Sequence, residues 1–413
     1  MTASRTVIIA GGGIGGLTAA LALARRGFRV TVLEQAQRLE ETGAGIQLSP
    51  NATRTLIELG LDDALRPLAV TPNALHVMNT LTGREIVRMP LGEFAEVRYG
   101  TPFWLIHRAD LLGALAGAAS RQLGITIKLD RQVQDFVVHP NGLTVSALTA
   151  TGIADERGFA VLAADGLWSS LRRQLGDRTP PDFTGRAAWR GSIAARDVRA
   201  EFREPAVHLW IGPDAHIVHY PVKAGRLINI VVIAADRDSV PDRSKLVTRA
   251  DLLSSLNDDG WTLPARTLVR LPDAWQKWPL YHRRPLQRWS RGRAALLGDA
   301  AHPMLPYLAQ GAAMAIEDAA VVADCLARRP DDPARALQAY CSTRRARTQK
   351  LQRLSDRNGA RYHFGRPVSW LRDAAMQTIG GKGLLKHYDW IYRWRPPASS
   401  AIQVKSEQSL EQF

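Results

Sequence analysis

The sequence contains little cysteine: only Cys325 and Cys341 occur among its 413 residues. One disulfide would be an unusual framework for a secreted protein of this length, so we expect a reducing, cytoplasmic location. The two cysteines lack the close spacing of a redox dithiol or a metal site, and no metal is predicted. The length predicts about two to three domains, with a core large enough to fold without disulfides.

Lysine is also scarce. Eight lysines and 46 arginines against 39 acidic residues give a net charge of +15. The arginines are scattered rather than gathered into a stripe, so we predict no nucleic-acid partner but an attraction for anionic substrates. One denser stretch is interpreted as a solvated helix face: Arg344, Arg345, Arg347, Lys350, Arg353, Arg357 and Arg361.

The chain has no long uninterrupted hydrophobic run. The segment from Val7 to Ala24 carries no charge over 18 residues, but five glycines between Gly11 and Gly16 interrupt it. Glycine at this density is poor for a lipid-facing helix, so neither a membrane span nor a signal peptide is predicted.

The same segment carries the first positive signal. Thr6–Ala10 is an apolar, β-branched run typical of a strand buried on both faces. It is followed by G-x-G-x-x-G as Gly11, Gly13 and Gly16, then by an Ala/Leu-rich helix, a second strand over 29–33 and Glu34. The glycines allow a tight turn, the approach of a pyrophosphate, and close helix packing, while Glu34 can accept hydrogen bonds from a ribose. This order predicts dinucleotide binding.

Two later turns resemble each other. Asp165-Gly166 follows the apolar run 159–164, and Gly298-Asp299 follows the apolar run 294–297. Ligands bind at the carboxyl ends of strands in a doubly wound sheet, so both turns are expected to face the nucleotide. A helix is predicted to begin near Gly311, where small residues allow a flat ring to rest on the backbone and the helix dipole favours negative charge.

These motifs, in this order, resemble the single-component FAD-dependent aromatic hydroxylases over roughly residues 5–360. The segments Gly45–Ala52 and His107–Leu112 also fit. The resemblance is strongest to the branch of salicylate hydroxylase, 3-hydroxybenzoate 6-hydroxylase and 6-hydroxynicotinate 3-monooxygenase. It implies an α/β fold with a Rossmann-like FAD domain, a β-sheet substrate domain and C-terminal helices.

The resemblance also implies a set of FAD contacts. Glu34 would bind the adenosine ribose, Arg108 the pyrophosphate or ribityl region, and Asp299 the ribityl chain. The full implied set is Gly11, Gly13, Gly15, Gly16, Glu34, Gln35, Gln47, Arg108, Val133, Asp165, Asp299, Pro306, Gly311 and Ala312. No second G-x-G-x-x-G unit is visible, which fits a family in which NADH or NADPH docks transiently.

The implied reaction is hydroxylation of a phenolic or hydroxypyridine carboxylic acid by O₂, through a flavin C4a-hydroperoxide, with or without loss of CO₂. Such a site needs a base or acceptor for the substrate hydroxyl and must exclude water. The alternative is a flavin oxidase or dehydrogenase that inserts no oxygen. A basic binding protein with a vestigial flavin fold is a further alternative. A monomer or a homodimer is expected.

The candidate substrate residues come mainly from a predicted hairpin over 206–222. Alternation places His216, Val218 and Tyr220 on one face and His219 on the other. His216 is the preferred base, with Tyr220 orienting the substrate and His219 as the second candidate base. His302, after the Asp299 turn, is a further catalytic candidate, while Gln47 and Pro306 are expected beside the flavin and substrate.

The predicted domain organisation is discontinuous. Residues 1–72, 100–178 and 280–342 form the FAD domain, and 73–99 and 179–279 form the substrate domain. Residues 343–395 are predicted to be helical, and 396–413 to form a flexible tail.

Overall fold

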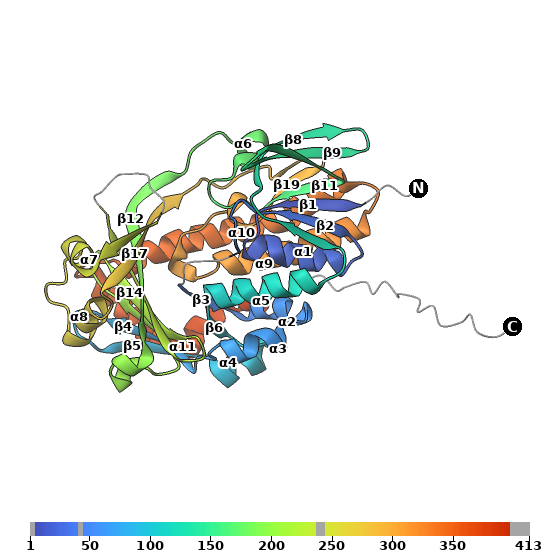
Figure 1. The fold of residues 1–413 in the computed structure, drawn as a ribbon. Coiled ribbons are helices and arrows are strands. Elements are labelled where there is room, and N and C mark those ends of the chain that lie inside the picture. The colour runs from blue at the N-terminus through green and yellow to red at the C-terminus, as the bar shows by residue number, and fades with distance from the viewer. Residues whose placement is uncertain (1–4, 40–43, 237–243, 397–413) are drawn as a thin grey trace.

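The structure is a computed structural model that describes residues 5–39, 44–236 and 244–396. Figure 1 shows one lobe around β1 (Thr6–Ala10) and another around β12 (Asp182–Ala194), with α9 (Gly311–Arg328) and α10 (Pro333–Tyr362) in the middle. The predicted tail lies outside the described residues from 397 onward. No helix in the described part of the chain is both long and apolar enough to span a bilayer.

The first lobe contains a six-stranded sheet in the order β18-β19-β11-β1-β2-β7. Every pair is parallel except β18 with β19. The central strands are buried on both faces because helices and the strands within 132–158 pack against the sheet, which explains their continuous apolar sequences. The further strands are β2 (Arg29–Leu33), β7 (Ile125–Lys128), β11 (Ala160–Ala163), β18 (Ser290–Arg291) and β19 (Ala294–Leu296).

The second lobe contains an eight-stranded sheet in the order β16-β17-β12-β15-β14-β13-β4-β5. All of its pairs are antiparallel except β13 with β4. The further strands are β4 (Ala74–Asn79), β5 (Glu85–Pro90), β13 (Val207–Ile211), β14 (His216–Val222), β15 (Leu227–Ala235), β16 (Lys245–Thr248) and β17 (Ala274–His282). The predicted hairpin is therefore β13 and β14.

Two smaller sheets complete the fold. One is a meander of β8 (Gln132–His139), β9 (Gly142–Thr149) and β10 (Gly152–Gly158), and the other pairs β3 (Gly45–Leu48) with β6 (Trp104–His107). The other helices are α1 (Ile14–Ala24), α2 (Pro50–Glu58), α3 (Asp62–Leu65), α4 (Gly92–Tyr99), α5 (Arg108–Arg121), α6 (Ser170–Gln174), α7 (Arg249–Ser255), α8 (Leu263–Arg270), α11 (Val368–His387) and α12 (Asp389–Tyr392). Short 3-10 turns are η1 (Arg66–Leu68), η2 (Ala195–Asp197), η3 (Ala200–Phe202), η4 (Gly298–Ala300) and η5 (Pro306–Leu308).

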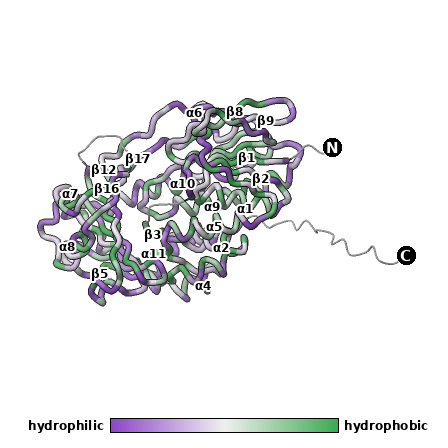
Figure 2. Tube along the Cα trace, viewed as in Figure 1, coloured by the Kyte–Doolittle hydropathy of each residue, from purple (hydrophilic) through white to green (hydrophobic). Residues whose placement is uncertain are grey.

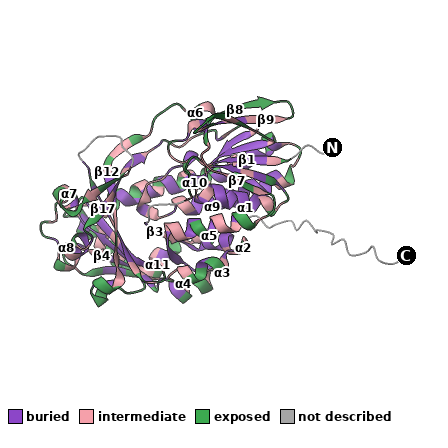
Figure 3. Ribbon diagram, viewed as in Figure 1, coloured by how far each residue is buried: buried purple, intermediate pink, exposed green. Residues whose placement is uncertain are grey.

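The largest core joins the first sheet to α1, α9 and α10. Figure 2 shows β1 among the hydrophobic segments of this lobe, and Figure 3 shows α9 largely buried. A separate core joins the outer face of the second sheet to α7 and α8. A further core joins α1 and α9 to α2, α5 and β6, so the FAD-side motifs lie between two cores. The face of the second sheet that carries α7 and α8 has a core of its own.

The domain division remains a prediction, but the elements cross two of its proposed limits. Strand β17 runs to His282, past the limit at 279, because its pairing with β12 extends to Asp182. Helix α10 runs unbroken from Pro333 to Tyr362, across the limit at 342.

Candidate active site

The glycine turn after β1 leaves no room for side chains where it meets its neighbours. A Cβ atom on Gly16 would lie 2.0 Å from the carbonyl oxygen of Gly11, and one on Gly11 would lie 2.4 Å from that of Ala164. Gly11 also has a φ of +109°, which favours glycine. A Cβ atom on Gly13 would meet nothing within 4 Å among the described residues. The turn is thus closed toward β11 and open where a phosphate would approach the start of α1.

Glu34 follows β2 and lies against this turn. Its Oε2 accepts a hydrogen bond from the Gly12 amide at 2.6 Å, and its Oε1 accepts one from the Ala36 amide at 2.9 Å. The carboxylate is half-buried, whereas the neighbouring Gln35 is exposed. Glu34 is thereby held beside the glycine turn, where the adenosine ribose is expected.

Asp165 follows β11 at the same edge of the sheet. Its Oδ2 accepts a hydrogen bond from the Ser170 amide at 3.0 Å, and the Ser170 hydroxyl donates to the Val133 carbonyl at 2.9 Å. Asp165 Oδ1 is buried and has no hydrogen-bond partner in the described ranges. Burial raises the pKa of Asp165. A buried acceptor beside the Gly11 turn fits a polar group of a bound dinucleotide.

The Asp299 turn meets the glycine turn through α9. A Cβ atom on Gly15 would lie 2.9 Å from the Leu297 side chain and 3.0 Å from that of Ala315, and one on Gly298 would lie 3.0 Å from Ala315. A Cβ atom on Gly311 would lie 3.9 Å from Asp299 Oδ1. Both turns therefore pack against the N-terminal part of α9, which begins at Gly311 as predicted.

Arg108 and Asp299 interact electrostatically across this region. Burial raises the pKa of Asp299, while His302 and Arg108 oppose the shift. Burial lowers the pKa of Arg108, and Asp299 opposes that shift. A cation and an anion near the start of α9 suit the phosphate and ribityl parts of FAD respectively. Together with the open glycine turn and the unpartnered Asp165 oxygen, they show that the residues present fit FAD.

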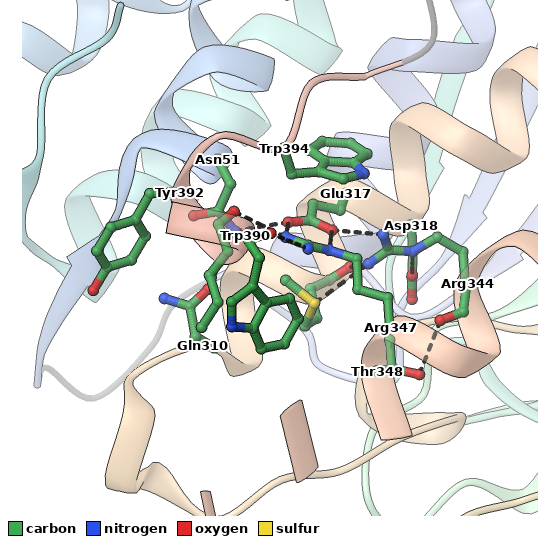
Figure 4. Close-up of polar contacts among 12 residues, drawn as sticks. Asn51, Gln310, Glu317, Asp318, Arg344, Arg347, Thr348, Trp390, Tyr392 and Trp394 are labelled. Atoms are coloured by element: carbon green, nitrogen blue, oxygen red, sulfur yellow. Dashed lines mark hydrogen bonds and ion pairs between the residues drawn. The ribbon is translucent and has the colours of Figure 1, made fainter. Parts of the chain in front are cut away.

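A buried network of ion pairs joins α9 to α10 next to the Asp299 turn (Figure 4). Arg344 donates to Asp318 Oδ1 at 2.6 Å and to Glu317 Oε2 at 2.5 Å, and Arg347 donates to Glu317 at 2.7 Å. Asn51 donates to Glu317 Oε1 at 2.7 Å, which links α2 to α9. Although burial alone would raise the pKa of Asp318, His302 and Arg344 lower it to about 2.

This network corrects the interpretation of the basic stretch as a solvated face. The Arg344 side chain is 1% exposed and that of Arg347 is 14% exposed, whereas Arg345 and Lys350 are exposed. The prediction was wrong for these two arginines because their partners lie on α9, some 30 residues away. A polar helix sequence does not reveal such a partner.

His302 belongs to the same network. Its Nε2 lies 2.6 Å from Asp318 Oδ2, which also accepts a hydrogen bond from the Gly298 amide at 3.0 Å. The His302 ring is 1% exposed and packs against Trp289. This geometry holds the Asp299 turn onto α9.

Strand β14 separates the predicted substrate residues by face. Tyr220 lies against β3, where a Cβ atom on Gly45 would be 2.6 Å from its ring, and its hydroxyl interacts with Gln47. His216 packs against Tyr307, the residue after Pro306. His219 lies on the opposite face, where it accepts a hydrogen bond from Trp210 Nε1 at 3.3 Å. The structure brings His216, Tyr220, Gln47 and Pro306 to one side and leaves His219 on the other.

His216 has a partner that sequence reasoning missed. Its Nδ1 lies 2.8 Å from Nε2 of His363, which follows the end of α10. Burial lowers the pKa of His216 well below 6.5, and His363 and Arg186 lower it further. The imidazole is therefore neutral near pH 7 and can accept a hydrogen bond. No local signal marks His363, because 147 residues separate the pair.

Arg190 on β12 is a second residue that the sequence did not single out. Burial lowers its pKa to about 10, Arg108 lowers it further, and Tyr220 raises it. The Arg190 guanidinium remains charged near pH 7, stacks 5.5 Å from the Trp278 ring centre and interacts with Tyr220. One half-buried arginine among 46 carries no distinguishing sequence pattern.

The fold and these turns define a dinucleotide-binding flavoprotein. Residues 4–355 match the family model described as FAD binding domain, and the chain belongs to this family. The chain is 36% identical over 389 residues to 3-hydroxybenzoate 6-hydroxylase 1 of Aquipseudomonas alcaligenes, with 94% of this chain and 97% of the relative covered. It is 33% identical over 362 residues to 6-hydroxynicotinate 3-monooxygenase of Pseudomonas fluorescens, with coverage of 87% and 92%.

A solved structure shares the fold. The salicylate hydroxylase substrate complex has a TM-score of 0.79 and 25% identity, with 97% of this chain and 100% of that chain covered. These matches confirm the resemblance to the FAD-dependent aromatic hydroxylases, the predicted fold class and FAD as the cofactor.

Proposed function

We propose that this chain is an FAD-dependent monooxygenase that uses NADH or NADPH and O₂ to hydroxylate a phenolic or hydroxypyridine carboxylic acid. The observation that carries the proposal is the placement of His216 and Tyr220, which face the lobe holding the FAD turns. The activities in the names of the relatives, on 3-hydroxybenzoate and 6-hydroxynicotinate, support the substrate class. Use of NAD(P)H is consistent with the expected cytoplasmic location.

The FAD would be held by the predicted residues. Glu34 would bind the ribose, the open Gly13 side of the turn the pyrophosphate, and Asp299 with Arg108 the ribityl region. Bound FAD supplies the redox chemistry that activates O₂ with electrons from NAD(P)H. The start of α9 at Gly311 and Ala312 would lie beneath the pyrimidine end of the ring, where the helix dipole favours negative charge.

His216 would act on the substrate hydroxyl. With Nδ1–H of His216 donating to Nε2 of His363, the His216 Nε2 lone pair is free to accept a hydrogen bond from the substrate. A bound substrate anion raises the pKa of a nearby imidazole, so the proton moves toward His216 as the ring becomes electron-rich. Hydroxylation then replaces a ring C–H bond with C–OH. His363 is a positioning residue that fixes the tautomer and orientation of His216.

Arg190 and Tyr220 would bind the rest of the substrate. A half-buried guanidinium suits a carboxylate because it donates two parallel, charge-assisted hydrogen bonds. Tyr220 would orient the ring, with Gln47 holding its hydroxyl. We assign His302 a positioning role through Asp318, and we assign His219 no contact with the substrate because it lies on the opposite face of β14.

The test is a screen of hydroxylated aromatic acids against the FAD-loaded protein. We expect a subset to stimulate NADH or NADPH oxidation and to yield a product that carries one atom from isotopically labelled O₂. The flavin oxidase alternative predicts peroxide in equal amount to the oxidised substrate and no label in the product. Colourless purified protein that cannot be loaded with FAD would exclude both flavin activities and favour a vestigial flavin fold.

A further inference from the structure

Three histidines form a ladder on the face of the second sheet that points away from the FAD lobe. His76 on β4 pairs in register with His208 on β13, and His208 pairs with His219 on β14. Their rings stack, with centroids 4.7 Å apart for His76 and His208 and 4.6 Å apart for His208 and His219. His216 occupies the other face of β14, so this ladder is separate from the candidate active site.

A carboxylate completes the cluster at one end. Glu204 lies in the loop before β13, with Oε1 3.8 Å from His76 Nε2 and Oε2 3.6 Å from His208 Nε2. The potential ligand atoms of these three residues all lie within 4.8 Å of one another. A tetrahedral ion with bonds of about 2.0–2.2 Å holds its ligand atoms roughly 3.3–3.6 Å apart, so the two nitrogen–oxygen distances need little adjustment.

The hydrogen bonding of His76 points to a ligand. Its Nδ1 lies 2.5 Å from Glu85 Oε2, so Nδ1–H donates to the carboxylate and the Nε2 lone pair is directed toward Glu204. His76 is 3% exposed, and its Nε2 has no hydrogen-bond partner in the described part of the chain. In the neutral imidazole, His76 Nε2 and the Glu204 carboxylate are both hydrogen-bond acceptors, and they face each other. A carboxylate behind an imidazole is also how proteins orient histidine ligands of metals.

We propose that His76, His208 and Glu204 bind one divalent cation of the zinc class, with water in the remaining position and Glu85 orienting His76. Two imidazoles with one carboxylate suit such a borderline ion better than Mg²⁺ or Ca²⁺, which prefer oxygen ligands. The side chain of Glu204 is 45% exposed, which gives the ion a route from solvent. The site joins two parallel-paired strands, β4 and β13, to the loop before β13. This proposal replaces the sequence expectation of no metal, because the three ligands come from segments that only the sheet brings together.

The test uses untagged, FAD-loaded protein that has been treated with a chelator and then titrated with Zn²⁺ in a calorimeter. Metal content after dialysis is measured by elemental analysis. We expect one equivalent to bind and to raise Tm. Glu204→Gln should weaken binding at least about tenfold, and His76→Gln should abolish it, because each removes a direct ligand. Glu85→Gln should weaken binding about 10–100-fold through loss of orientation.

The matched control is His139→Gln, which removes an exposed histidine on β8 in the other lobe. This variant should still bind one equivalent of Zn²⁺. Near-ultraviolet circular dichroism and FAD content report whether each variant folds, and Glu204→Gln alters a side chain that is 45% exposed. No Zn²⁺ binding by the parent protein, or equal binding by the parent and Glu204→Gln, would overturn the proposal.

Discussion

The buried network behind the Asp299 turn leads to a quantitative prediction for Arg344→Met. Methionine is close to arginine in length but carries no charge. The substitution removes the Arg344 contact from both buried carboxylates. Asp318 keeps its contact with His302, and Glu317 keeps its contacts with Arg347 and Asn51. The side chains of Glu317 and Asp318 are both 0% exposed, so water cannot replace the lost guanidinium.

The expected cost follows from these contacts. Removing one member of a buried ion pair costs about 3–5 kcal/mol, because the carboxylates that remain have less compensating charge and water cannot replace it. A chain of 413 residues unfolds with an entropy of roughly 0.9 kcal/mol/K if it unfolds cooperatively, so Tm should fall by about 3–6 °C. Because Asp318 also holds the Gly298 amide and His302, we expect weaker FAD retention as well.

The assay compares thermal unfolding of the FAD-loaded parent, Arg344→Met and Arg345→Met. Arg345 is the next residue on α10 and is exposed, so its loss should change stability by no more than about 0.5 kcal/mol. Equal Tm values for the two variants would refute the claim that the network stabilises the fold.

The pH dependence supplies a second readout of the same variant. The folded pKa of Asp318 is about 2, below the unfolded value of about 3.9, so its contribution is full above pH ~4 and is lost as the pH falls toward 2. Arg344→Met raises this folded pKa and loses part of the contribution. The Tm difference between parent and variant should therefore shrink as the pH is lowered from about 5 to about 3, and a growing difference would contradict the assigned sign.

Four further predictions concern the active site. His216→Ala should keep FAD yet reduce the rate of hydroxylation, measured as product formed per unit time, by about 10²–10⁴-fold, because the acceptor for the substrate hydroxyl is lost. An unchanged rate would remove His216 from the mechanism. Because the pKa of His216 lies well below 6.5, the plot of kcat/KM against pH should show no inflection from this residue between pH 8 and 6.5. His363→Phe should change this pH dependence while leaving the FAD content unaltered. Arg190→Met should raise KM for the aromatic acid by about 10–100-fold through loss of a charge-assisted contact, whereas an unaffected KM would place the carboxylate elsewhere. Glu34→Ala should raise the dissociation constant for FAD, measured by fluorescence of the released flavin, and full retention would count against the ribose contact.

Much of the candidate site could be predicted because its signals are local. Each of its turns depends on a few consecutive residues, and only certain residue types can adopt the backbone conformation that such a turn requires. This holds for the turn after β1, the two aspartate turns and the start of α9. Alternation along β14 likewise separates His216 and Tyr220 from His219, since successive side chains of a strand point to opposite faces. The structure places these elements as their sequences indicate.

The contacts that escaped prediction join distant segments. The charge of Arg344 is visible in the sequence, but its burial depends on Glu317 and Asp318 of the preceding helix. His363 reaches His216 only because α10 ends beside β14, and His76 meets His208 only because β4 and β13 pair in parallel across some 130 residues.

The sequence by itself therefore determined the kind of cofactor and the turns that would hold it, because short-range backbone geometry restricts which residues can form them. Only the tertiary structure decided which charges are buried together, which histidine orients the candidate base, and where two histidines and a carboxylate converge. Those outcomes depend on strand pairing and helix packing between remote parts of the chain, whose free energy is spread over many contacts and leaves no mark at any single position.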